Sequence, residues 1–171
     1  MRDGALVKGW LDLNGAKYWF DKDSGKMAVG WTDLEVDGKT MHYYFNPVSG
    51  NLARGTWMDI DGKKYYFRPS GNKATGWATI SDNGVDKKYY FDPKGQMLTG
   101  WWDIDNGQGV TNHYYFRPSG SMATGWAKID GTQHFFRPSG NMATGFTDVP
   151  DDAYKRYFDQ DGSMLTGWQQ I

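Results

Sequence analysis

Short runs of alternating apolar and polar residues follow one another along this chain, and most of them begin at a Gly-Trp pair. In residues 57–67, WMDIDGKKYYF, the pair Asp61-Gly62 separates two such runs. An Asp-Gly pair favours a two-residue hairpin turn, because that turn needs positive φ at both positions. Alternation with a period of two is typical of half-buried strands. The pattern therefore predicts a β-hairpin.

The position of the turn also predicts which side chains share a face. With Asp61-Gly62 as the turn, Trp57 lies opposite Tyr66 and Asp59 lies opposite Lys64. Successive side chains of a strand point to opposite faces. One face of the hairpin then carries Met58, Ile60, Tyr65 and Phe67, and the other carries Trp57, Asp59, Lys64 and Tyr66.

This hairpin pattern recurs seven times, at steps of 20 to 26 residues. Insertions of even length keep every side chain on its face, whereas an odd slip would reverse the faces. The fifth repeat inserts five residues and needs a three-residue turn or a bulge, which Gly107 and Gly109 could supply. In the other lengthened repeats, turns at Asp37-Gly38, Asn83-Gly84 and Asp151-Asp152 place Trp31 opposite Tyr44, Trp77 opposite Tyr90, Thr79 opposite Lys88 and Phe146 opposite Tyr157.

A fixed connector follows each second strand. In Phe67-Arg68-Pro69-Ser70-Gly71 the proline and glycine predict a turn that re-aims the chain. A Met comes two residues after the glycine in five repeats, and Leu52 and Lys73 take its place in the other two. A lone hairpin is only marginally stable, so the aromatic rows are expected to pack between repeats.

The fold class predicted from this period is all-β, a solenoid of about seven stacked β-hairpins. Residues 1–171 are predicted to form a single repeat domain. The N-terminus lacks the pattern of a signal peptide, and the chain starts and stops at the same phase of the repeat, so we expect a piece of a longer array. The repeats are placed at about 10–30, 31–56, 57–76, 77–100, 101–125, 126–145 and 146–167, with partial repeats at 1–9 and 168–171.

Composition and charge narrow the possible functions. The net charge is −1, aromatic residues make up 17% and cysteine is absent. No basic stripe is available to bind nucleic acid, and no apolar run approaches the ~20 residues of a membrane span. Three scattered histidines predict no metal site. The sequence contains none of the common catalytic motifs, so neither catalytic residues nor a cofactor are predicted.

The order Gly-Trp, Asp/Asn-Gly, Tyr-Tyr-Phe, turn, Gly-x-Met-x-Thr-Gly-Trp resembles the cell-wall-binding repeat superfamily over the whole chain. That superfamily includes choline-binding repeats of pneumococcal surface proteins and lysins, glucan-binding repeats of glucansucrases and C-terminal repeats of large clostridial toxins. The resemblance implies a β-hairpin solenoid with ligands bound between successive hairpins.

One position departs from the choline-binding pattern. Where that pattern has a second Trp, before the aromatic pair, this chain has no aromatic residue. A lysine suits an ammonium cage poorly, because it repels the cation. In the predicted register five of these residues face an acid, which favours weak cross-strand ion pairs: Asp12 with Lys17, Asp33 with His42, Asp59 with Lys64, Asp103 with His113 and Asp148 with Lys155.

The candidate ligand-binding residues are the aromatic side chains on the Trp face, which form either the interlocking core or partly exposed platforms for sugars. These residues are Trp10, Trp19, Trp31, Tyr44, Trp57, Tyr66, Trp77, Tyr90, Trp101, Tyr115, Trp126 and Trp168. His42 and His113 are predicted as surface partners of Asp33 and Asp103, and His134 as a packing substitute for a tyrosine.

The leading hypothesis is a non-catalytic module that anchors a secreted protein to a bacterial cell-wall polymer or surface glycan. The expected partners are teichoic acid, glucan or a host glycan, with neither nucleic acid nor a membrane span. One alternative is a choline-binding module that recognises choline on teichoic acid. Another is a structural stalk or protein-binding repeat, including toxin receptor-binding repeats. The predicted location is secreted or at the cell surface, associated with the wall.

Overall fold

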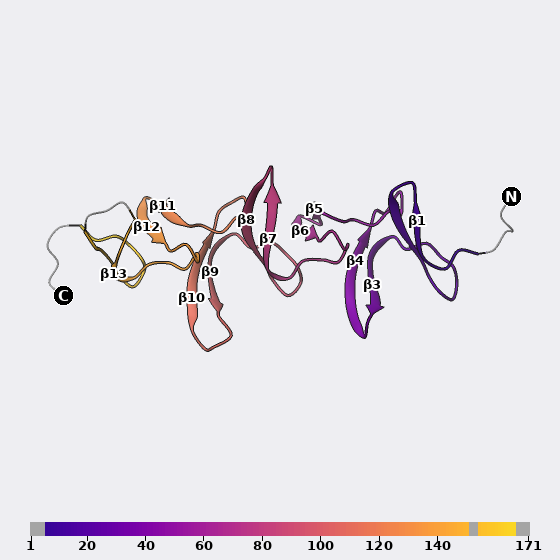
Figure 1. Cartoon of the computed structure of the whole chain (residues 1–171), viewed down its shortest axis with the longest axis horizontal. Helices are drawn as coiled ribbons and strands as arrows, with labels where there is room; N and C mark the ends of the chain where they lie inside the picture. The colour runs from indigo at the N-terminus through magenta and orange to yellow at the C-terminus, as the bar shows by residue number, and fades with distance from the viewer. Residues whose placement is uncertain (1–5, 151–153, 167–171) are drawn as a thin grey trace. The chain divides into compact units, whose positions relative to one another are not determined.

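The computed structural model describes residues 6–150 and 154–166 of the chain. These residues contain 14 strands and no helix, and the strands form seven separate antiparallel hairpins (Figure 1). The all-β prediction is therefore confirmed. The hairpins are β1 (Gly9–Leu13) with β2 (Ala16–Phe20), β3 (Gly30–Val36) with β4 (Lys39–Phe45), β5 (Thr56–Ile60) with β6 (Lys63–Phe67), β7 (Gly76–Asp82) with β8 (Val85–Phe91), β9 (Gly100–Asp105) with β10 (Thr111–Phe116), β11 (Gly125–Ile129) with β12 (Thr132–Phe136), and β13 (Gly145–Thr147) with β14 (Arg156–Phe158).

The chain divides into two compact units. Among the described residues, the first unit comprises residues 6–76 and 91–97. The second unit comprises residues 77–90, 98–150 and 154–166. The hairpins of both units are built on the same repeated sequence pattern, so each unit can be described in the same terms.

The predicted register is confirmed in the hairpins whose pairing is defined. Trp57 pairs with Tyr66 and Asp59 with Lys64 across the β5–β6 hairpin. Asp61 and Gly62 both have positive φ, 50° and 70°, as a two-residue hairpin turn requires. Other predicted pairs that are observed are Trp31 with Tyr44, Asp33 with His42 and Phe146 with Tyr157. The predicted Asp151-Asp152 turn lies outside the described residues.

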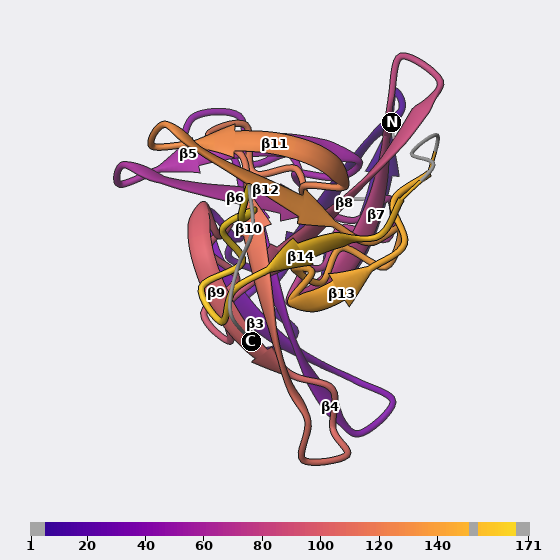
Figure 2. The ribbon, with the colours of Figure 1, turned by 90° about the vertical axis from the view of Figure 1, so that its left-hand side faces the viewer.

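The odd insertion of the fifth repeat is accommodated by a three-residue turn, one of the two alternatives that the sequence left open. The Asn106 N–H donates to the Val110 carbonyl over 3.0 Å and closes a turn of residues 107–109. Gly107 and Gly109 have φ values of 81° and 78°, and the Asn106 side chain accepts the N–H groups of Gln108 and Val110. Figure 2 shows this turn at the tip of the β9–β10 hairpin.

The core consists of the phenylalanines that end the second strands. Phe67 and Phe136 are fully buried, and each lies in a cluster with a buried isoleucine and alanine. Around Phe67 the cluster holds Ile60 and Ala53. The same terminal position supplies the other fully buried large side chains, Phe45, Phe91, Phe116 and Phe158.

Six connectors are each joined by a backbone hydrogen bond to the hairpin one repeat earlier than the hairpin that they follow. The Lys73 N–H donates to the His42 carbonyl and the Met142 N–H donates to the His113 carbonyl, both over 2.8 Å. The acceptor is the residue before the aromatic pair, so this link does not depend on its side chain. The same link joins Leu52 to Lys17, Met97 to Lys64, Met122 to Lys88 and Met164 to Gln133.

Candidate functional site: aromatic grooves between hairpins

The tryptophan of each Gly-Trp pair contacts aromatic rings from two hairpins. Trp31 meets Tyr44 of its own hairpin edge-on, with ring centroids 5.1 Å apart. It meets Tyr65 of the following hairpin at the same distance and angle. Phe67 lies beneath, with its centroid 5.7 Å from that of Trp31. We name this arrangement the Trp31 groove, and name each equivalent groove after its tryptophan.

The second unit repeats the arrangement twice in full. Trp77 lies 5.0 Å from Tyr90 and 5.1 Å from Tyr114, measured between ring centroids. Trp101 lies 5.1 Å from Tyr115 and 5.0 Å from His134. The side chains of Trp31, Trp77 and Trp101 are each 42% exposed. These tryptophans are therefore partly exposed, while the phenylalanines supply the core.

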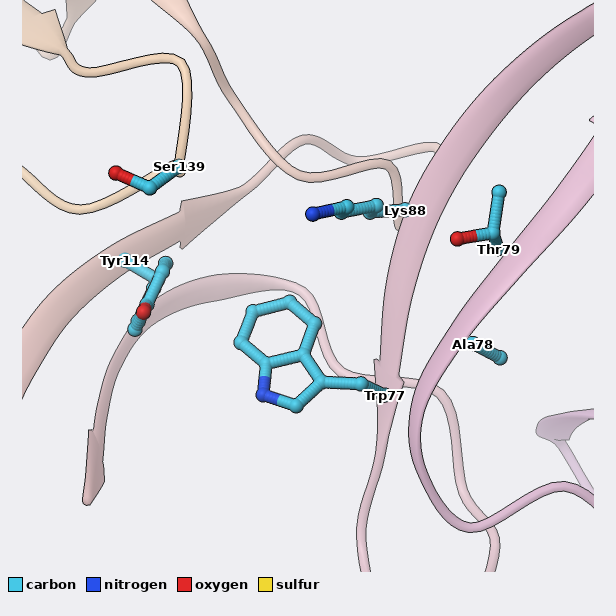
Figure 3. Close-up of a pocket in the computed structure, with 6 residues that line it drawn as sticks. All are labelled: Trp77, Ala78, Thr79, Lys88, Tyr114 and Ser139. Atoms are coloured by element: carbon cyan, nitrogen blue, oxygen red, sulfur yellow. The ribbon is translucent and has the colours of Figure 1, made fainter. Parts of the chain in front are cut away.

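The Trp77 groove opens into a cavity of about 300 Å³. Its lining combines the ring of Trp77 with the hydroxyl groups of Thr79, Tyr114 and Ser139. Lys88 also lines it, and its ammonium end is directed toward Tyr114 and Ser139 (Figure 3). An apolar ring face beside several hydrogen-bonding groups is the kind of surface that can hold a sugar.

The lining of the Trp101 groove is acidic, whereas that of the Trp77 groove contains a lysine. Its cavity is about 380 Å³, and its lining contains Asp103, Asp130 and Asp161 but neither lysine nor arginine. Asp103 is bonded to His113, with 2.5 Å between Oδ1 and Nδ1. His134 is only 6% exposed, and its Nδ1 has no hydrogen-bond partner in the described structure.

Lysine ammonium groups lie over four tryptophan rings of the first unit, one of them Trp19, whose centroid is 5.6 Å from Lys22 Nζ. Lys17 Nζ is 5.0 Å from the Trp10 centroid and Lys64 Nζ is 5.9 Å from the Trp57 centroid. Lys73 Nζ is 5.6 Å from the Trp31 centroid. These distances are within the range of cation–π attraction. In the described part of the second unit, no lysine lies over Trp77 or Trp101 in this way.

Four of the five predicted cross-strand pairs are observed. Lys17 lies 4.0 Å from Asp12, Lys155 lies 3.5 Å from Asp148, and both histidines meet their aspartates. The predicted ion pair of Asp59 and Lys64 is wrong. The two residues face each other in the register, but Lys64 lies over the Trp57 ring instead. Both choices are weak at an exposed site, so strand pairing alone does not decide between them.

The structure brings most of the candidate residues together in pairs within single hairpins. The paired rings are Trp10 with Trp19, Trp31 with Tyr44, Trp57 with Tyr66, Trp77 with Tyr90 and Trp101 with Tyr115. Trp126 meets Phe135, and Trp168 lies outside the described residues. The candidate list missed the ring that the following hairpin contributes, which is Tyr43, Tyr65, Tyr114 or His134. The first aromatic of each Tyr-Tyr-Phe run was the available signal.

Burial shifts the acidity of three groups beside these rings. It raises the pKa of the Tyr43 and Tyr114 phenols, because the charged phenolate is disfavoured away from water. Burial lowers the pKa of the Lys73 ammonium, while Asp33 and Asp92 act against that shift. Among the described residues, no group of three histidine, aspartate or glutamate side chains could hold a metal ion.

Sequence comparison identifies the repeat. A family model described as "Choline-binding repeat" matches residues 7–57, 53–102 and 98–146. The chain belongs to the choline-binding repeat family. It is thus a choline-binding repeat module with aromatic clusters between its hairpins. None of its described residues forms a helix that is long and apolar enough to cross a membrane.

Relatives of this choline-binding repeat module are larger proteins. Glucosyltransferase-S of Streptococcus downei is 35% identical over 74 residues, which are 43% of this chain and 5% of that protein. The solved structure of CbpJ from Streptococcus pneumoniae is 31% identical with a TM-score of 0.75, over 93% of this chain and 52% of CbpJ. CbpF in complex with ipratropium is 31% identical with a TM-score of 0.77, over 93% of this chain and 54% of CbpF. The chain thus spans about half of each of these two solved structures.

Proposed function

We propose that this chain is a non-catalytic module that attaches a secreted protein to a bacterial cell-wall polymer or surface glycan. The observation that carries the proposal is the repeated groove in which a tryptophan, 42% exposed at Trp31, Trp77 and Trp101, meets rings from two hairpins. Hydroxyl groups and charged side chains line the cavities beside these rings. Such a surface offers an apolar platform and hydrogen bonds to one sugar unit per groove.

Several weak grooves on one chain suit a long polymer. Once one groove has bound, the next binds at a high effective concentration, so the overall affinity can exceed that of one groove by about 10²–10⁴. Loss of two grooves should therefore weaken retention far more than loss of one.

The test is retention on purified cell walls, teichoic acid and dextran. We expect the wild type to be retained on at least one of them and the Trp77→Ala/Trp101→Ala double variant to lose at least about tenfold in affinity. Val48→Ala, at a side chain that is 94% exposed, is the matched control. A folded wild type that binds none of the three polymers contradicts the proposal and favours a structural stalk or a protein-binding repeat.

Choline on teichoic acid is the second candidate ligand. The family match and the complex of CbpF with ipratropium, a quaternary ammonium compound, support it. So does the Trp101 groove, where an aromatic face is lined by three aspartates. Elution of wall-bound protein by millimolar free choline supports this candidate, whereas elution by glucan oligosaccharides alone supports the glycan.

A further inference from the structure

Lys73 occupies a place that holds methionine in most repeats, and its backbone is held in the same way. Its N–H donates to the His42 carbonyl, and its carbonyl accepts from Arg68 Nη1, both over 2.8 Å. The backbone of Met142 makes the corresponding bonds to His113 and Arg137, also over 2.8 Å. The two side chains therefore leave equivalent backbone positions.

The stem of Lys73 fills the space that the thioether fills elsewhere. Its Cδ lies so close to Gly95 that a Cβ on that glycine would collide with it, as a Cβ on Gly162 would collide with Met142. A lysine side chain is longer than a methionine side chain. The Lys73 ammonium therefore extends past this space toward Trp31, and its Nζ lies 5.6 Å from the ring centroid.

The charged groups around this ammonium already have partners of their own. Asp33 Oδ1 lies 2.6 Å from His42 Nδ1, and Asp92 Oδ1 accepts the Gln96 N–H over 2.8 Å. Both carboxylates favour the charged form of Lys73, and burial disfavours it. The ammonium is consequently the cation of this groove, supplied by the chain itself.

We infer that Lys73 determines the ligand class of the Trp31 groove by excluding ammonium ligands from it. This inference rests on the proposed function, because it assigns a specificity to one of the proposed grooves. A second cation over the same ring would lie within a few ångströms of Nζ and be repelled. The ring itself is 42% exposed, so the groove stays open to uncharged or anionic sugar units. The Trp101 groove, with Met142 in place of the lysine and aspartates in its lining, has no such exclusion.

The test follows the indole N–H signals of Trp31 and Trp101 by NMR while tetramethylammonium is added, with Trp31→Phe and Trp101→Phe used for assignment. In the wild type we expect the Trp101 signal to shift and the Trp31 signal to stay in place. In Lys73→Met the Trp31 signal should shift as well, with an affinity at least about tenfold above the wild-type value. Lys94→Met removes one charge from an exposed connector residue and should leave the wild-type pattern unchanged.

A Trp31 signal that shifts equally in the wild type and Lys73→Met overturns the inference, and so does a Lys73→Met protein in which it never shifts. A second readout needs no ligand. The Hε protons of Lys73 should show an upfield ring-current shift that Trp31→Leu abolishes, and absence of that shift also overturns the inference. Failure of the wild type on every wall polymer, with the ring-current shift present, contradicts the proposed function alone.

Discussion

The two units have cores of the same kind, built on buried phenylalanines, and differ in what lies over their tryptophans. In the first unit the rings of Trp10, Trp31 and Trp57 each have a lysine ammonium of the chain within 6 Å. In the second unit Trp77 and Trp101 have the same aromatic neighbours, but no lysine among the described residues lies over either ring. The packing that makes a groove is therefore separable from the charge that decides what the groove accepts.

The lysines over these three rings occupy two positions of the repeat, and Lys88 holds the first of these positions in the second unit without lying over Trp77. Lys17 and Lys64 stand before the aromatic pair, where their backbone carbonyls accept the N–H groups of Leu52 and Met97. Lys73 stands in the methionine place of the connector. The position before the aromatic pair lies outside the buried clusters, whereas the connector position lies within them where it holds Leu52, Met122 or Met142. We expect the first unit to bind cations poorly and the second unit to provide the cation-accepting groove at Trp101.

Removing a core phenylalanine from either unit should have the strongest effect. Phe67→Ala in the first unit and Phe136→Ala in the second should each lower the free energy of unfolding by about 3–5 kcal/mol, because both side chains are fully buried. Urea denaturation measures this loss, with the exposed Val48→Ala as the control. Losses that differ by more than about 2 kcal/mol would contradict cores of the same kind.

The next prediction tests whether a lysine in the connector is sufficient to exclude ammonium ligands from a groove. Met142→Lys should weaken tetramethylammonium binding at the Trp101 groove by about tenfold, because the new ammonium would take the place that Lys73 takes beside Trp31. Met142→Leu is the matched control, since Leu52 fills the same place in another repeat. NMR titration of the Trp101 indole signal measures the change. Equal affinities in the lysine and leucine variants would show that this position does not control the groove.

A smaller effect is expected from the position before the aromatic pair. Lys88→Trp adds a ring beside Trp77 and should raise choline affinity there by about three- to tenfold, consistent with one added cation–π contact. Lys88→Gln removes the charge without adding a ring and should give less of the gain. Calorimetry with choline compares the variants, and a tryptophan variant no better than the glutamine variant would exclude a role for the added ring.

The smallest effect is the response to alkaline pH, where Tyr43 and Tyr114 offer one probe in each unit. Burial raises each phenol pKa above its ordinary 10.0, so the folded state keeps these protons longer than the unfolded chain does. Their contribution to stability is intact below pH 10 and is lost as the pH rises through the folded pKa. Lys73 has the opposite sign, because its lowered pKa makes stability rise with pH as it approaches 10.5.

Urea midpoints measured from pH 8 to 11 check these signs. Tyr43→Phe and Tyr114→Phe should each make the decrease of the urea midpoint above pH 10 less steep. Lys73→Met should make that decrease steeper. If neither tyrosine variant changes the decrease, then these two phenols do not cause it.

The hairpins could be predicted from the sequence because local chemistry fixes them. Asp61-Gly62 favours a tight turn with positive φ at both positions, and even insertions preserve the faces of the strands. The number of inserted residues in the fifth repeat likewise indicated a special turn or bulge at Gly107 and Gly109. The rings that share a hairpin, such as Trp31 and Tyr44, could therefore be paired in advance.

Contacts between hairpins were less accessible to sequence reasoning. Tyr65 and His134 complete the grooves of the preceding hairpins, and their placement depends on how a connector aims the next strand pair. Lys73 contacts Trp31 from a connector 42 residues further along the chain, so no local sequence pattern predicts the contact. Lys64 had two weak partners of similar strength, and the register favours neither of them.

One NMR experiment tests whether the grooves bind wall polymer and whether the chain's own lysines determine their selectivity. It follows the indole N–H signals of Trp10, Trp31, Trp57, Trp77 and Trp101 during titration with soluble choline-bearing teichoic acid and, separately, with tetramethylammonium. We expect the polymer to shift signals in both units, and tetramethylammonium to shift Trp101 but none of the three first-unit tryptophans. Equal shifts of Trp31 and Trp101 with tetramethylammonium, or no shift with either ligand, would contradict this expectation.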